Sequence, residues 1–175
     1  NGQCLAFEPP DLGPLLGEPA GAATLGGVLA SNMAGPRRLT AGAARDHFLG
    51  ARAISGRGEV FASGGRVVKN VTGYDLPKLL AGSYGTLAAI TEVTVKVLPA
   101  AEKLRTVIIA GLDDDVAIAA MSRALSGPHD VSAAAHLPAA GAASSAVARV
   151  RDPGISVTAL RIEGPEPSVL VRCQE

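Results

Sequence analysis

Two glycines that follow a threonine form the strongest candidate for a binding site in this chain. Thr24-Leu25-Gly26-Gly27 lead into Val28 to Ala34, a run typical of a short helix that Gly35-Pro36 would stop. At a helix start the backbone N–H groups are free and the dipole is positive, so an anion is attracted there. Glycines also let a phosphate or a flat ring approach the backbone. A glycine-lined packing turn is the alternative that the local pattern leaves open.

Two polar residues lie one turn further on. Ser31 and Asn32 offer a hydroxyl and an amide to a polyol or to the edge of a ring. The chain contains neither the Gly-x-x-x-x-Gly-Lys-Ser/Thr loop nor the Gly-x-Gly-x-x-Gly turn, which argues against a P-loop and a Rossmann dinucleotide site.

A second glycine-containing segment, Ala81 to Gly85, imitates a nucleophile elbow with Ser83 at its centre. A true elbow follows a buried strand and begins a helix. This segment follows a predicted helix and enters a predicted strand, so we do not expect a serine hydrolase. His47, beside Asp46, is expected to be a polar residue at a strand edge rather than a catalytic base.

Composition narrows the class of protein further. The 175 residues include 16 basic and 16 acidic side chains without a long block of either sign, which argues against binding to nucleic acid. Two cysteines, Cys4 and Cys173, make no disulfide framework, and with three scattered histidines they have no metal-ligand spacing. A reducing cytoplasm fits this cysteine usage.

The first hundred residues read as short strands and helices. We expect a strand over Gln3 to Phe7 and an antiparallel meander over residues 48–54, 59–62 and 66–70. Asp75 should cap a helix that runs to Ala81, with Pro77 in its first turn. The alternation from Thr91 to Leu98 predicts a strand with its valines on one face.

A different pattern follows Pro99. It predicts strands over 104–110, 131–137 and 155–162, a helix over 116–125 with Ile118, Met121 and Leu125 on one face, and a further helix from Pro165. We place a domain boundary near residue 101, giving residues 1–100 and 101–175. The fold class predicted is α+β with a mostly antiparallel sheet and flanking helices.

Four ordered motifs together resemble one known family. They are the runs at Gln3 to Pro10, Thr24 to Arg38, Lys69 to Leu76 and Gly82 to Glu92. The family is the FAD-binding domain of the vanillyl-alcohol oxidase and p-cresol methylhydroxylase type. Within it, the Pro36-Arg37-Arg38 and Gly73-Tyr74-Asp75 blocks look most like the FAD-binding subunit of bacterial glycolate oxidase. The resemblance is strong over residues 1 to about 100 and looser over 104–175. It implies a second FAD-binding subdomain followed by the first part of a cap or substrate domain.

The resemblance also implies roles for individual residues. The backbone of Thr24, Leu25, Gly26 and Gly27 would pack against the flavin and the pyrophosphate region of FAD. Ser31 and Asn32 would lie near the ribityl chain or the flavin edge. Ser83, Gly85 and Ile90 would line the cofactor cleft. No catalytic residue is transferred, because the His-rich and Arg substrate residues of hydroxy-acid dehydrogenases have no match here.

Some family features are absent from the sequence. A further glycine-rich loop that grips the pyrophosphate would precede Asn1, and Tyr84 and Ala88 stand where relatives commonly have Glu and Gly. The final residues from Ser168 look like the opening turns of a helix. We therefore expect the sequence to be a piece of a longer protein.

The function implied is FAD-dependent oxidation of glycolate or a similar 2-hydroxy acid to the 2-keto acid, as one subunit of a multi-subunit enzyme. Electrons would leave through an iron–sulfur subunit, with a sister flavin subunit also present. The alternatives are a structural or electron-relay subunit and a relative acting on another hydroxy acid or an aldonolactone. We expect a cytoplasmic location. Peripheral attachment to the inner membrane through partner subunits is the alternative.

Overall fold

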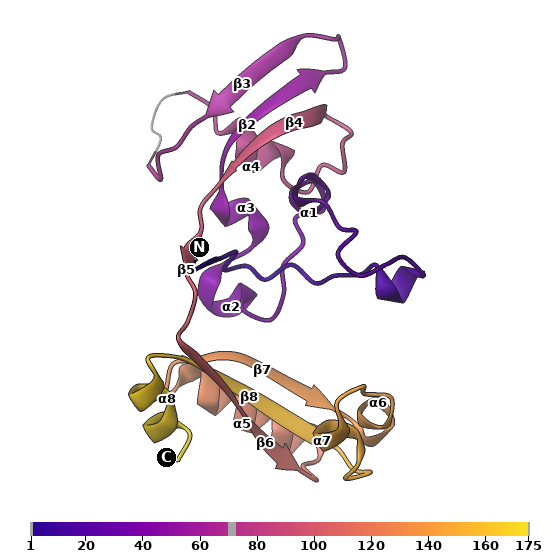
Figure 1. Ribbon diagram of the computed structural model, residues 1–175, viewed down its shortest axis with the longest axis vertical. Coiled ribbons are helices and arrows are strands. Elements are labelled where there is room, and N and C mark those ends of the chain that lie inside the picture. Colours follow the sequence, from indigo (N-terminus) through magenta and orange to yellow (C-terminus); the bar gives the residue numbers. More distant parts are fainter. Residues whose placement is uncertain (1, 70–72, 175) are drawn as a thin grey trace. The chain divides into compact units, whose positions relative to one another are not determined.

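The computed structural model describes residues 2–69 and 73–174, and the chain divides into two compact units, Asn1–Pro99 and Ala100–Glu175 (Figure 1). The elements of the first unit are β1 (Gln3–Cys4), the 3-10 helix η1 (Pro14–Leu16), α1 (Leu25–Ser31), α2 (Arg38–Ala41), α3 (Ala44–His47), β2 (Phe48–Ser55), β3 (Val60–Gly64), α4 (Leu76–Leu80), β4 (Ala88–Val95) and β5 (Leu98–Pro99). Those of the second are β6 (Lys103–Ala110), α5 (Asp114–Ser126), β7 (Val131–Leu137), α6 (Ala139–Ala143), α7 (Ala148–Arg151), β8 (Val157–Gly164) and α8 (Glu166–Arg172).

The main sheet of the first unit is antiparallel, with strand order β3-β2-β4, and β1 pairs separately with β5. The prediction of a third meander strand over residues 66–70 is wrong for residues 66–69, which form no strand. Asn70 lies outside the described residues. The chain leaves the sheet at Gly64, which has φ +75°, and a Cβ there would lie 2.1 Å from the carbonyl oxygen of Leu49. β4 takes the third place instead.

The N-terminal strand is shorter than expected. It ends at Cys4, because Glu8 donates its N–H to the carbonyl oxygen of Leu5 and closes a turn. This turn places Phe7 inside the protein, where it is fully buried.

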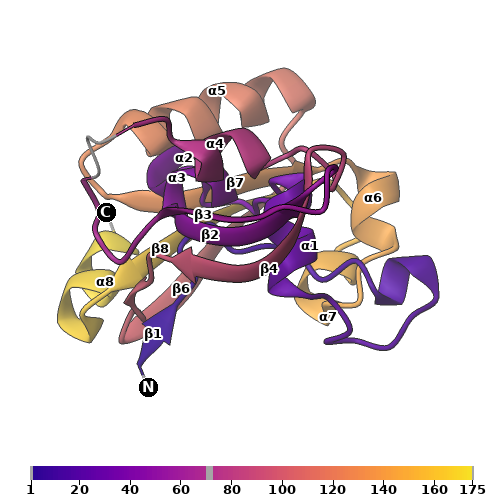
Figure 2. The same ribbon diagram turned by 90° about the horizontal axis from the view of Figure 1, so that it is seen from above.

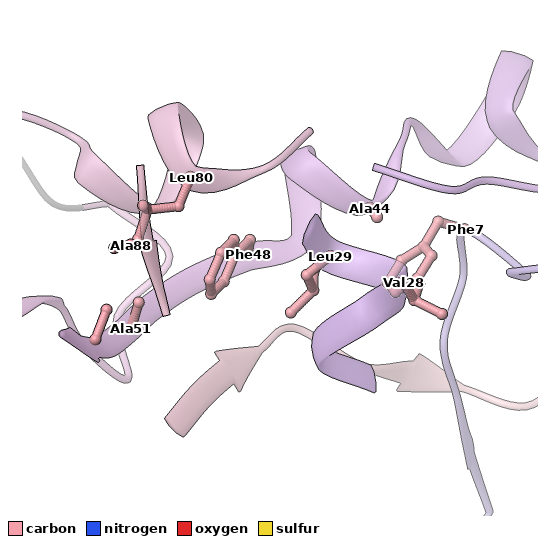
Figure 3. Close-up of a cluster of buried hydrophobic side chains, with 9 residues drawn as sticks. Phe7, Val28, Leu29, Ala44, Phe48, Ala51, Leu80 and Ala88 are labelled. Atoms are coloured by element: carbon pink, nitrogen blue, oxygen red, sulfur yellow. The ribbon is translucent and has the colours of Figure 1, made fainter. Parts of the chain in front are cut away.

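A hydrophobic cluster holds the first unit together and fixes α1 in it. Figure 3 shows Leu29 between Phe48 on one side and Val28 with Phe7 on the other. Leu80 from α4 and Ala88 from β4 complete the same cluster, so the helices are packed on one face of the sheet. Burial of this kind contributes about 1.5–3 kcal/mol for each large apolar side chain.

For the first unit, the predicted cap at Asp75 is confirmed, the predicted valine face of the strand is confirmed in part, and the predicted place of His47 is wrong. Asp75 caps α4, because its Oδ1 accepts the N–H of Lys78 at 3.2 Å. Val93 and Val95 of β4 pack against the cluster as predicted, whereas Val97 lies beyond the strand and is 37% exposed. β4 begins and ends three residues earlier than expected. His47 is not at an exposed strand edge: it is 3% exposed, and its Nε2 lies 2.8 Å from the carbonyl oxygen of Ala41.

The second unit has a three-stranded antiparallel sheet with the order β6-β8-β7. Ile162, Val131 and Val169 form a small core where helices α5 and α8 pack against this sheet. Figure 2 shows α5 beside β7. The predicted strands and the helix after Pro165 are present, with β8 shifted by two residues. Ile118 is 60% exposed and so not on the packed face, since the small side chain of Ala117 is buried there instead.

No helix within residues 2–69 and 73–174 combines the length and the apolar character needed to cross a membrane.

Candidate functional site

Helix α1 carries the first group of candidate residues and begins earlier than the sequence pattern predicts. Thr24 is its N-cap, and the Thr24 hydroxyl oxygen accepts the N–H of Gly27 at 3.1 Å. Gly26 and Gly27 therefore lie in the first helical turn, rather than in a turn before a helix at Val28. The helix ends at Ser31, with Asn32 as its C-cap at φ +52°, and not at Gly35-Pro36.

Because α1 has only seven residues, its dipole adds little, and the local backbone is what it can offer to a ligand. Within the described part of the chain, the N–H groups of Leu25 and Gly26 donate to no acceptor. A Cβ built on Gly26 meets nothing within 4 Å. The outward backbone at Gly26 is thus open to a close approach.

The side chains of Ser31 and Asn32 are already engaged in the protein. The Ser31 hydroxyl donates to the carbonyl oxygen of Gly27 at 2.8 Å. The side-chain oxygen of Asn32 accepts the N–H of Arg45 at 2.8 Å, which ties the end of α1 to α3. Ser31 keeps an acceptor lone pair, and Asn32 keeps its NH₂ group as a donor.

The second glycine-containing segment is docked directly on α1. Gly82 donates its N–H to the carbonyl oxygen of Leu29 at 3.1 Å, and Tyr84 donates its N–H to that of Ala30 at 2.8 Å. Gly82, Tyr84 and Gly85 all have positive φ, at +79°, +53° and +76°. Two segments that are far apart in the sequence are thereby joined through their backbones.

Ser83 lies within this docked segment. Its Oγ is buried and has no hydrogen-bond partner among the described residues. An unsatisfied buried hydroxyl costs free energy, and such groups call for an explanation.

The other two predicted residues differ in exposure. Gly85 is exposed, and a Cβ on it would meet nothing within 4 Å. Ile90 is half-buried on β4 opposite Ala53 and packs against the cluster that contains Leu29. Ile90 thus supports α1 from the sheet side.

A cavity of about 280 Å³ lies against another face of α1. Thr24, Gly27 and Ser31 contribute one of its walls, and the loop before the helix contributes the other. The remaining lining residues are Pro10, Leu12, Gly13, Leu16, Glu18, Ala22, Ala23, Val28 and Met33. The volume lies just below the ~300–1,000 Å³ that small-molecule pockets occupy.

The chemistry of this cavity is mainly apolar. Glu18 is the only charged side chain among the described residues that line it. A carboxylate without a neighbouring lysine or arginine disfavours phosphate, whereas apolar walls beside two hydroxyls suit an uncharged ring. The sequence analysis did not identify the loop residues that line this cavity. The prolines within residues 9–19 could have indicated a loop of fixed shape.

Comparisons with known proteins were made by sequence and by structure. No family model matches the chain. It is 49% identical over 98 residues to glycolate oxidase subunit GlcE of Escherichia coli, covering 56% of this chain and 26% of the relative. It is 40% identical over 102 residues to an uncharacterized FAD-linked oxidoreductase of Mycobacterium tuberculosis, covering 58% and 22%. Over about 100 residues the chain is thus similar in sequence to a glycolate oxidase subunit and to a protein named as an FAD-linked oxidoreductase. A further relative, D-lactate dehydrogenase of Archaeoglobus fulgidus, is 43% identical over 77 residues, covering 44% of this chain and 17% of the relative.

The chain spans about a quarter or less of the length of these relatives. Among solved structures, alkyldihydroxyacetonephosphate synthase matches with a TM-score of 0.69 and 20% identity, over 99% of this chain and 33% of that one. This likeness shows the fold and confirms the predicted α+β class, with antiparallel sheets and flanking helices.

Proposed function

We propose that this chain is the FAD-binding part of an oxidoreductase that converts glycolate or a similar 2-hydroxy acid to the 2-keto acid. The observation that carries the proposal is the docking of Gly82 and Tyr84 on α1, because it joins the two segments that resemble flavin-binding motifs. The names of the relatives support the reaction class and the flavin.

The residues present fit a flavin in two respects. The open backbone at Gly26 allows close approach of a planar ring, and the apolar cavity beside Thr24, Gly27 and Ser31 suits an uncharged part of the cofactor. The lining of that cavity favours a ring over the pyrophosphate there, because Glu18 would repel phosphate.

FAD, when bound, supplies the acceptor for the hydride that leaves the α-carbon of the acid. The chain's own contribution is to bind and orient. The backbone of Thr24 to Gly27 would contact the cofactor, with Ser31 and Asn32 beside it. Ser83 and Gly85 of the docked segment and Ile90 of β4 do not line the cavity beside Thr24, Gly27 and Ser31. They would border the cofactor from another face of α1.

A non-catalytic structural or electron-relay subunit is the second candidate function. The observation that favours it is that no histidine, lysine or arginine is among the described residues lining the cavity beside α1. The chain would then assist a sister flavin subunit. For either function we propose an assembly with that sister subunit and an iron–sulfur subunit. We propose that this assembly is cytoplasmic and that any attachment to the inner membrane is peripheral and made through the partner subunits.

Purification of the chain with FAD, followed by absorption spectroscopy and anaerobic addition of glycolate or D-lactate, tests the proposal. Bound flavin that bleaches with a 2-hydroxy acid supports the oxidase function. Bound flavin that no acid in the panel reduces supports the relay function. The absence of bound flavin, in a chain whose circular dichroism shows the α+β fold, overturns the oxidase and the electron-relay functions and supports the structural one.

A further inference from the structure

The loop between Glu8 and Ala23 forms the outer wall of the cavity beside α1. In Figure 1 it runs out from the body of the first unit, carries η1 and returns to α1. The tip of the loop is strongly exposed, with Leu15 at 80% and Leu16 at 73%. Little apolar burial therefore stabilises its shape, and hydrogen bonds must do so.

One carboxylate joins the two ends of this loop. Oδ1 of Asp11 accepts the N–H of Gly13 at 3.0 Å, and Oδ2 accepts the N–H of Gly21 at 2.7 Å. The carbonyl oxygen of Gly13 in turn accepts the N–H of Glu18 at 2.8 Å. Hydrogen bonds to an ionised carboxylate are stronger than bonds between neutral groups.

The residues beside these hydrogen bonds are the ones that line the cavity. Pro10 and Leu12 flank Asp11, and Ala22 follows Gly21. At Gly13 the turn is tight, since a Cβ there would lie 2.7 Å from the carbonyl oxygen of Pro19. The position of the cavity wall opposite Gly27 and Ser31 is thus coupled to the two contacts of one side chain.

We infer that Asp11 is a positioning residue for ligand binding: by bonding to Gly13 and Gly21 it holds the apolar wall at a fixed distance from α1, and so shapes the cavity for an uncharged aromatic ring. The inference rests on the proposed function, since it assumes that the cavity receives part of the flavin. Asp11 itself lies outside the cavity lining and does not touch the ring.

The test uses the chain with two probes, FAD and lumiflavin, which is the flavin ring without ribityl chain or phosphate. Fluorescence quenching measures their affinity for the wild type, Asp11→Ala and Asp11→Asn. Asp113→Asn is the matched control, because that carboxylate caps α5 without a side-chain hydrogen bond. Amide hydrogen exchange follows Gly13 and Gly21 in the loop and Leu29 in the core.

We expect Asp11→Ala to weaken lumiflavin binding about tenfold or more, with faster exchange at Gly13 and Gly21 and unchanged exchange at Leu29. Asp11→Asn keeps an acceptor oxygen for one of the two N–H groups, so it should restore part of the affinity. Should the alanine variant unfold, the asparagine variant decides in the same way.

Wild-type affinity in a variant whose loop amides exchange faster would overturn the inference and leave the proposed function standing. Unchanged loop exchange in Asp11→Ala would overturn it as well, because the carboxylate would not be what holds the wall. A wild-type chain that binds neither probe would instead overturn the proposed function, and the inference with it.

Discussion

Tyr84 donates its backbone N–H to the carbonyl oxygen of Ala30 at 2.8 Å, and this bond fixes the docked segment at the end of α1. Tyr84 has φ +53°, a conformation that costs a non-glycine residue about 1–2 kcal/mol. The side chain is 75% exposed, so its own packing does not compensate. Contacts elsewhere in the segment must hold this backbone.

Replacement of Gly82 should weaken that docking. Gly82 has φ +79°, where a branched residue is strained, and its N–H bonds to Leu29. We expect Gly82→Val to lower the free energy of unfolding by about 1–3 kcal/mol, measured by urea denaturation. Gly56→Val is the control, because a Cβ at Gly56 has open space and φ is not positive. Equal stability of both variants would contradict the proposed role of the docked segment.

Truncation of Leu29 tests the packing that places α1. Its side chain is fully buried between the flanking members of the cluster in Figure 3. Leu29→Ala should cost about 2–5 kcal/mol of unfolding free energy, since it leaves a cavity in a packed core. Leu39→Ala, at a position 77% exposed, should change it by less than about 0.5 kcal/mol. Thermal unfolding of both variants measures the difference.

Elements with strong local signals were predictable from sequence. The cap of α4 at Asp75 and the bounds of β7 are examples, because side-chain capping and strand patterning act over a few residues. The start of α1 at Leu25 was not predicted from the sequence. Gly26 and Gly27 have low helix propensity, which placed the predicted start at Val28, whereas burial of Leu29 and the cap at Thr24 override that propensity.

The site itself could be predicted only in part. The two glycine-containing segments were identified separately by resemblance, but their contact through Leu29 and Ala30 depends on tertiary packing. The burial of His47 was missed for the same reason: its ring packs against Phe7, with the centroids 5.3 Å apart, and no local pattern encodes that contact. The cavity wall could not be predicted either, because it depends on the hydrogen bonds from Gly13 and Gly21 to Asp11. No periodic pattern in the sequence indicates those two contacts.

The second unit should lose stability in acid through Glu166. A hydrogen bond from the Lys103 ammonium and its positive charge hold the pKa of the Glu166 carboxyl below its ordinary value. Because the folded-state pKa is the lower one, this contribution is present above the ordinary pKa of 4.5 and is lost as the pH falls through the folded value. Glu166→Gln should flatten the fall in unfolding temperature between about pH 5 and pH 3. A fall as steep as that of the wild type would contradict the prediction.

The two glycines of α1 should differ when replaced, and the difference tests whether α1 contacts the flavin. A Cβ at Gly26 meets open space, so Gly26→Val should change unfolding free energy by only about 1 kcal/mol and yet abolish FAD binding by blocking the exposed backbone. At Gly27 a Cβ lies 3.2 Å from the Thr24 hydroxyl oxygen, so Gly27→Val should also disturb the cap and cost about 1 kcal/mol more. Flavin absorbance after gel filtration measures binding, and urea denaturation measures stability. A Gly26→Val chain that stays yellow would mean that the cofactor does not touch this turn, because a branched side chain there leaves no room for a ring against the backbone.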